Sequence, residues 1–121
     1  MTIRIEITGI KEALGKIDTE NNKIRLEIAK GVEEAGLIVE AEVKLSIAGQ
    51  RSEPRSVDTG RLLGSVTSYA RGLIATVETD IEYAKYLEYG TVRISPRLHF
   101  RNSAVRKRQD VINAIKRRIN R

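Results

Sequence analysis

Hydrophobic residues recur along the first half of the chain with two different periods. Ile3, Ile5 and Ile7 alternate with polar residues, which predicts a strand with one buried face. A three-to-four-residue spacing between residues 10 and 17 predicts a short helix, and the same spacing continued from residue 20 to 47 predicts one long helix. The apolar stripe of the long helix consists of Ile24, Ile28, Val32, Ala35, Val39, Val43 and Ile47.

Two features of this long helix bear on how it packs. From residue 37 onward its apolar stripe widens, which is typical of burial against a sheet and a second neighbour. Gly31 and Gly36 lie inside the helix, where each costs about 1 kcal/mol relative to Ala. Either these glycines have no packing role and their cost is tolerated, or they allow close approach by a neighbouring backbone, such as that of another subunit. The residues that widen the stripe are Leu37, Ile38, Ala41 and Leu45.

A polar stretch and then a hairpin follow the long helix. Residues 49–57 contain a proline and show no periodicity, which predicts a mobile polar loop. Such a loop is most often a solvated connector, and a binding role is the alternative. Residues 66–70 and 73–79 are predicted as two strands joined by a tight turn at Gly72. The second strand begins with apolar residues on both faces, which predicts burial on two sides there.

Two helices are predicted in the last third of the chain. Residues 83–89 have the spacing of a two-turn helix, and Gly90 fits the position just after its end. Residues 92–94 are predicted as a brief strand. Asn102 or Ser103 is predicted to cap the final helix, which is strongly basic.

This order of elements predicts an α+β fold in a single domain, residues 1–121. A small antiparallel sheet would pack against the long helix and the C-terminal basic helix. A sheet of about three strands has exposed edges, and pairing with a neighbouring subunit is one way in which proteins cover such edges.

Composition narrows the chemistry. The chain has no cysteine and a single histidine, which excludes a disulfide framework and a cysteine nucleophile and argues against a zinc site. No apolar run approaches a membrane span of roughly 20 residues. We therefore expect a soluble, intracellular protein without a cofactor. Residues 101–121 hold eight Lys/Arg and one Asp (+7), while the other hundred residues hold 14 basic and 15 acidic groups (−1). The high charge therefore belongs to the terminal helix.

Three motifs occur in a fixed order along the second half of the chain. Asp58-Thr59-Gly60-Arg61-Leu62 precedes the hairpin, Tyr83-Ala84-Lys85-Tyr86-Leu87-Glu88-Tyr89-Gly90-Thr91 follows it, and Phe100 and Ala104 begin the basic region. This order resembles the tail-completion, or tail-component, family of long-tailed bacteriophages. The sequence departs from that pattern at His99 and Ser103, where proline is commoner. The matching positions are Asp58, Thr59, Gly60, Leu62, Tyr83, Ala84, Leu87, Glu88, Tyr89, Gly90, Thr91, Phe100 and Ala104.

The resemblance implies a structural virion protein of a phage or prophage, with no catalysis. It implies a ring of identical subunits at the head–tail junction, or neck, around the channel through which double-stranded DNA passes. Its partners would be other copies of itself and the neighbouring connector and tail proteins. The isolated subunit would be a monomer or a ring. The protein would be made in the host cytoplasm and end in the virion.

Each candidate site residue has a structural and a functional explanation. Glu88 is predicted to bridge to a basic group such as Arg61 or Arg97, either to fix the loop or to contact another subunit. Tyr83, Tyr86 and Tyr89 either fill an otherwise aliphatic core or face a partner.

The basic helix has three explanations. It is a solvated face, it binds DNA phosphates without sequence preference, or it docks on an acidic neighbour. No base-reading motif is present in the sequence. Its candidate residues are Arg106, Lys107, Arg108, Lys116, Arg117 and Arg118.

The rival hypothesis is a small basic nucleic-acid-binding protein or a toxin-like ribonuclease. A ribonuclease needs a general acid or base and cations on the scissile phosphate. Arg93, Arg97 and His99, with nearby tyrosines, are the residues from which such a site would have to be built.

Overall fold

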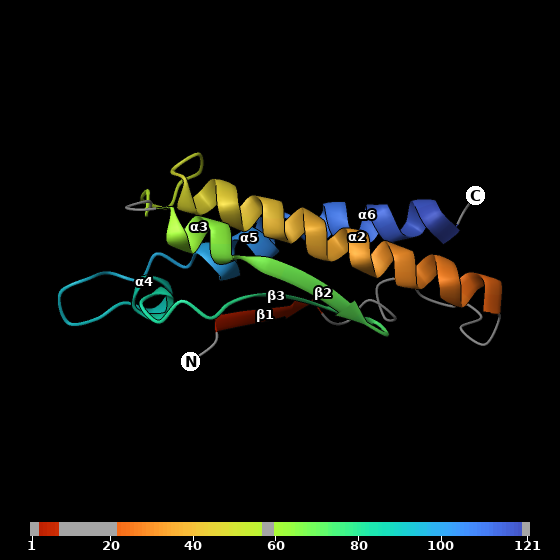
Figure 1. The fold of residues 1–121 in the computed structure, drawn as a ribbon. Coiled ribbons are helices and arrows are strands. Elements are labelled where there is room, and N and C mark those ends of the chain that lie inside the picture. The colour runs from red at the N-terminus through yellow and green to blue at the C-terminus, as the bar shows by residue number, and fades with distance from the viewer. Residues whose placement is uncertain (1–2, 8–21, 57–59, 120–121) are drawn as a thin grey trace.

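The computed structural model describes residues 3–7, 22–56 and 60–119, and its helices and strands form the predicted α+β fold (Figure 1). The predicted short helix at residues 10–17 lies outside the described residues, as do Asp58 and Thr59. The elements are β1 (Ile3–Ile7), α2 (Asn22–Ile47), α3 (Arg61–Ser65), β2 (Thr67–Arg71), β3 (Ile74–Thr79), α4 (Ala84–Tyr89), α5 (His99–Arg106) and α6 (Arg108–Ile119).

The 26-residue helix α2 forms where the apolar stripe predicts it, and the core is built along it. It packs against β2 and β3 on one side and against α5 and α6 on another (Figure 1). The predicted burial against a sheet and a second neighbour is therefore confirmed. Leu37 and Leu45 do not contribute to it, because they are 55% and 38% exposed. The stripe residues that are at most 3% exposed are Ile28, Val32, Ala35, Val39, Val43 and Ile47.

The sheet has three antiparallel strands in the order β1-β3-β2, so β3 is central and the other two are edges. β2 and β3 form the predicted hairpin. Its two-residue turn places Gly72 first, with a φ of 57°, which a side chain would disfavour.

The start of β3 is buried on both faces, as predicted, at Ala75 and Thr76, but not at its first residue. Ala75 and Val77 are fully buried beneath α2, whereas Ile74 is 41% exposed. Ile74 pairs with Arg71 directly after the turn and points to the opposite face from Ala75. At that position α2 covers one side of the hairpin, and the isoleucine lies on the other.

The C-terminal region differs from the prediction in two places. Residues 92–94 form a turn rather than a strand, because the Thr91 N–H donates to the Ile94 carbonyl at 2.8 Å. Helix α5 begins at His99, so Asn102 and Ser103 lie inside it and do not cap it. The chain then breaks at Lys107 before α6 continues, so the predicted single helix is two.

Gly31 and Gly36 mark where α2 is approached by other elements of the same chain. A Cβ at Gly31 would lie 3.1 Å from both Cα and Cγ1 of Ile115 on α6. A Cβ at Gly36 would lie 3.4 Å from Cβ of Ser68 on β2, an ordinary contact distance. The close-approach explanation therefore holds for Gly31, and the approaching backbone belongs to α6 of the same chain.

Gly31→Ala and Gly36→Ala form a matched pair within one helix. Both substitutions gain up to about 1 kcal/mol of helix propensity. At Gly31 the new methyl group must push the α6 backbone away, so we expect a net loss of about 1–3 kcal/mol. At Gly36 we expect no loss, because the methyl group fits. Urea unfolding of the two variants measures the difference, and equal stabilities would contradict the packing argument.

Candidate functional site

Glu88 joins α4 to the start of α5. Its side chain is buried, and its two carboxylate oxygens accept the backbone N–H groups of Phe100 at 2.9 Å and Arg101 at 3.1 Å. These are first-turn donors of α5, which have no partner inside a helix, so Glu88 caps α5 from a distance. Burial raises the pKa of Glu88 above its ordinary value, and the two backbone donors oppose that rise. Of the two predicted roles, these contacts support fixing of the loop, and they are made with backbone N–H groups instead of the predicted Arg61 or Arg97.

The loop between α4 and α5 is held in one shape by its own hydrogen bonds. Gly90 has a φ of 79°, and a Cβ there would lie 2.7 Å from the Ile94 carbonyl oxygen. The Thr91 hydroxyl accepts the N–H groups of Arg93 at 3.2 Å and Ile94 at 3.1 Å. The Arg97 N–H donates to the carbonyl of Leu87 at 2.7 Å and closes the loop. The loop therefore projects from one end of the molecule as an ordered structure (Figure 1).

The tyrosines of α4 lie on the surface and do not fill the core. Tyr83, Tyr86 and Tyr89 are 37%, 44% and 65% exposed. The Lys85 ammonium lies over the Tyr86 ring, 5.0 Å from its centroid. Val92 in the adjoining loop is fully exposed. Together these side chains form an apolar and aromatic surface at the end of the molecule.

A cluster of charged groups lies between α2, the 49–56 loop and α5. The side chains of Glu42 and Glu53 are 1% and 3% exposed. The Arg106 guanidinium donates to both carboxylates, at 2.8 Å to Glu42 and at 2.8 and 2.9 Å to Glu53. Arg51 adds a second guanidinium on Glu42, with Nε at 2.7 Å. The 49–56 loop is therefore not simply a solvated connector.

These contacts set the protonation of both carboxylates. Hydrogen bonds from Arg106 are the main reason that the pKa of Glu53 lies far below its usual range. At Glu42 burial raises the pKa, but the donors from Arg51 and Arg106 outweigh it and leave a lowered value. Both groups are therefore ionised at neutral pH.

His99 continues this cluster toward the α4–α5 loop. The Ser46 hydroxyl donates to Glu53 at 2.5 Å, because an ionised carboxylate can only accept. Ser46 must then accept from Nδ1–H of His99, 2.7 Å away. The neutral ring accepts at Nε2 from Ser56 at 2.8 Å, and Ser56 accepts from Arg97 Nη1 at 2.7 Å. Burial lowers the pKa of His99 to about 4, which is consistent with the neutral ring.

The sequence held one signal of this cluster. Glu42 and Ser46 lie one helical turn apart on α2, next to stripe positions Val39 and Val43. Polar side chains at such positions are buried, and buried polar groups need partners. Their partners, Glu53 and Arg106, are distant in sequence, and no local sequence pattern identifies them as partners.

The family model described as "Bacteriophage HK97-gp10, putative tail-component" matches residues 9–90. The chain belongs to this tail-component family. The matched region includes α2, the hairpin and α4, and it ends before α5 and α6. Neither a curated protein nor a solved structure matches the chain.

Several residues of the tail-component motifs are core residues or adopt a backbone conformation that begins a helix. Gly60 precedes α3 with a φ of 79°, and Leu62 is buried. Ala84 and Phe100 are core residues, and Ala104 packs against the same core. Leu87 also packs there. These motif positions therefore join α3, α4 and α5 to one shared core.

The six basic candidates divide into paired and unpaired groups. Arg106 pairs with the cluster described above, and Lys107 lies 3.3 Å from Asp110. Arg118 forms ion pairs with Glu34 and, at 3.7 Å, with Glu27. Within residues 22–56 and 60–119, Arg108, Lys116 and Arg117 have no ion-pair partner and are exposed.

The residues needed by the ribonuclease hypothesis do not meet at a surface. His99 is 2% exposed and both of its ring nitrogens are engaged by serines. Arg93 lies on the exposed turn, while Arg97 donates to Ser56 and to the Arg55 carbonyl. The described residues hold no group of three or more His, Cys, Asp or Glu suited to a metal ion. None of their helices is long and apolar enough to span a membrane.

Glu88→Gln tests the distant cap. The amide keeps the size of the side chain but replaces one acceptor with a donor that faces a backbone N–H. We expect a loss of about 1–3 kcal/mol in the free energy of unfolding. Glu82→Gln, which changes an exposed carboxylate just before α4, is the control and should be neutral. Chemical denaturation measures both, and equal effects would contradict the capping role.

His99 predicts a pH dependence of stability. Its pKa is about 4 in the folded protein against 6.5 ordinarily, so the unfolded state binds more protons between these values. Stability therefore falls as pH falls from about 6.5 to 4, by at most about 1.4 kcal/mol per pH unit from this group. His99→Gln should show a shallower dependence in the same window. Comparing the two proteins cancels the titration of Glu88 and other shared groups, and identical slopes would contradict the assignment.

Proposed function

We propose that this tail-component protein is a structural virion protein that completes the tail or joins it to the head. It acts as a ring of identical subunits around the DNA channel and has no catalytic activity. The observation that carries the proposal is the family match over α2, the hairpin and α4, the parts that build the core and the exposed tyrosine surface.

The distribution of exposed groups supports an assembling subunit. Tyr86 and Tyr89, with Val92 of the adjoining turn, lie exposed at one end of the molecule, and tyrosine is enriched at protein interfaces. β2 is an edge strand hydrogen-bonded to β3 on one side. Both features suit contacts with other copies and with connector and tail proteins.

The unpaired cations of α6 support a contact with DNA that does not read sequence. Arg108, Lys116 and Arg117 are exposed on one helix, and point charges of this kind bind phosphates by releasing counterions. Half of the six basic candidates are already neutralised by carboxylates of the same chain, so any DNA contact is weak. Such a contact suits a channel through which DNA must move.

The test is an assembly assay with separately purified heads and tails of particles that lack this protein. Addition of the protein should restore joining, and negative-stain images should show a ring on the tail or in solution. The product should show no cleavage of RNA. Absence of both rings and joining would contradict the proposal, and RNA cleavage that His99→Ala abolishes would favour the rival hypothesis.

A further inference from the structure

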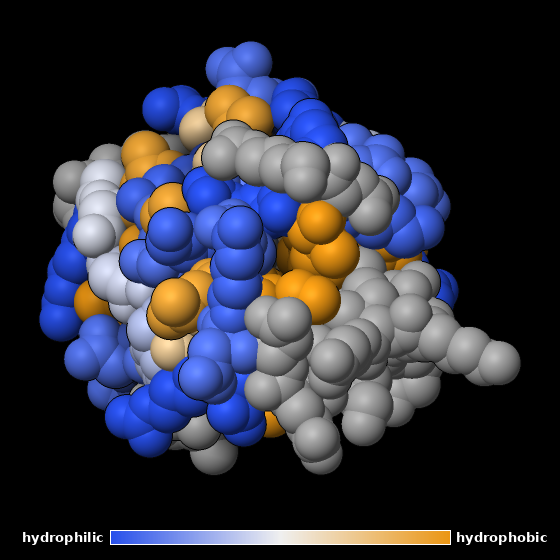
Figure 2. Space-filling model, turned by 90° about the vertical axis from the view of Figure 1, so that its right-hand side faces the viewer, coloured by the Kyte–Doolittle hydropathy of each residue, from blue (hydrophilic) through white to orange (hydrophobic). Residues whose placement is uncertain are grey.

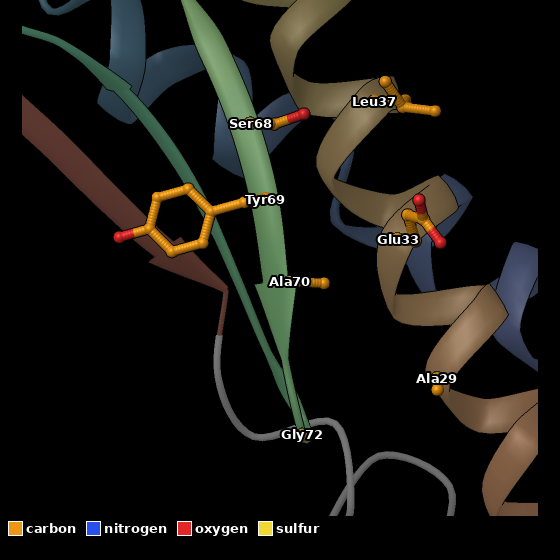
Figure 3. A pocket seen from close by; sticks show the side chains of 7 residues that line it. All are labelled: Ala29, Glu33, Leu37, Ser68, Tyr69, Ala70 and Gly72. Atoms are coloured by element: carbon orange, nitrogen blue, oxygen red, sulfur yellow. The ribbon is translucent and has the colours of Figure 1, made fainter.

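A groove of about 420 Å³ runs between α2 and the edge strand β2 (Figure 3). On the strand side Ser68 and Ala70 point toward the helix, while Tyr69 points away. On the helix side the groove is lined by Ala29, Glu33 and Leu37, which lie one turn apart. Gly72, in the hairpin turn, lines one end of the groove. Figure 2 views the end of the molecule at which the hairpin turns and shows hydrophobic atoms exposed between hydrophilic ones.

Glu33 gives this groove a negative charge with apolar neighbours. Its carboxylate is exposed and has no ion-pair partner within the described part of the chain, whereas Glu27 and Glu34 of the same helix pair with Arg118. Leu37 on the next turn is 55% exposed. The helix wall of the groove therefore presents an apolar, an acidic and an apolar position in succession.

The turn at the other end of the molecule presents the complementary succession of side chains: apolar, basic and apolar. Val92 is fully exposed, Ile94 is 37% exposed, and Arg93 lies between them. The Arg93 guanidinium has no ion-pair partner within the described part of the chain. Because Thr91 holds this turn in shape, docking it costs little conformational entropy.

We propose that the 92–94 turn of one copy docks in the α2–β2 groove of a second copy. Arg93 then meets Glu33, and Val92 and Ile94 pack against Leu37 and Ala29. The turn and the groove lie toward opposite ends of the molecule, so the contact is head-to-tail (Figure 1). Repetition of a head-to-tail contact generates a ring when its rotation closes. The inference rests on the proposed ring assembly and names the contact that builds it.

Charge exchange tests the contact on the full chain. Glu33→Arg and Arg93→Glu should each reduce the assembled fraction about tenfold or more, because each places like charges together. The double variant should assemble like the native protein. A mixture of the two single variants should also assemble, because alternating subunits restore every Arg–Glu pair. Glu82→Arg and Arg55→Glu are controls at exposed positions outside both surfaces, and they should leave assembly unchanged.

Cysteine cross-linking tests the geometry independently. The native chain has no cysteine, so in a mixture of Val92→Cys and Leu37→Cys proteins each copy carries one thiol. A mixed 92–37 disulfide, distinguished from like-with-like dimers by oxidising each protein alone, reports the proposed contact. Glu82→Cys, which lies at the same end as the turn, replaces Leu37→Cys in the control mixture. Oxidation should give a cross-linked dimer with the first pair and at most a trace with the second.

The outcomes separate this inference from the proposed function. Suppose that rings form and join heads to tails, that the Glu33 and Arg93 variants assemble as well as the native protein, and that no 92–37 cross-link forms. This result would overturn the proposed contact and leave the proposed function standing. Cross-linking of Val92→Cys to a different particle protein in place of a second copy would also overturn the contact. If neither rings nor joining is observed, the proposed function itself fails.

Discussion

The guanidinium of Arg106 between two buried carboxylates is the contact on which the arrangement of this molecule depends. Glu42 comes from α2 and Glu53 from the loop that follows it, and Arg106 ends α5. Removing the guanidinium would leave the buried Glu53 without its main partner and Glu42 with one hydrogen-bonding guanidinium, that of Arg51, and breaking a buried ion pair typically costs about 3–5 kcal/mol. A hydrophobic replacement of the whole cluster can be neutral, so its value lies in where it places these segments.

Helix α5 is therefore fixed at both ends. Glu88 holds its first turn through two backbone N–H groups, and Arg106 holds its last turn through Glu42 and Glu53. The chain of hydrogen bonds through Ser46, His99 and Ser56 connects the same region to Arg97, at the end of the exposed loop. The loop is thus anchored on the core by polar contacts. Its apolar side chains can remain exposed because the backbone beneath them is ordered by other means.

The limits of the sequence prediction follow from the range of the interactions. The stripe of α2 and the alternation around Gly72 are local patterns, so the long helix and the hairpin could be predicted from residues close to one another. The start of α5 could not, because its cap is Glu88, twelve residues before Phe100, and Leu98 precedes the helix with a φ of 53°. Asn102 is a residue type that often caps helices, but the carboxylate of Glu88, distant in sequence, determines where α5 begins. The charged cluster was missed for the same reason, since Glu53 reaches Arg106 across 53 positions.

The C-terminal segment has more cationic residues in the sequence than it presents unpaired at the surface of the folded protein. Arg106 and Arg118 are bound to carboxylates contributed mainly by α2, so part of the cationic excess is used to attach α5 and α6 to the long helix. The cations that remain lie on the outer side of α6, while Glu33 remains on the side of α2 that faces β2. Folding thus converts a uniformly basic segment into a molecule with separated charges. In the ring that we propose, these separated charges would orient neighbouring copies, because like surfaces repel and unlike surfaces attract.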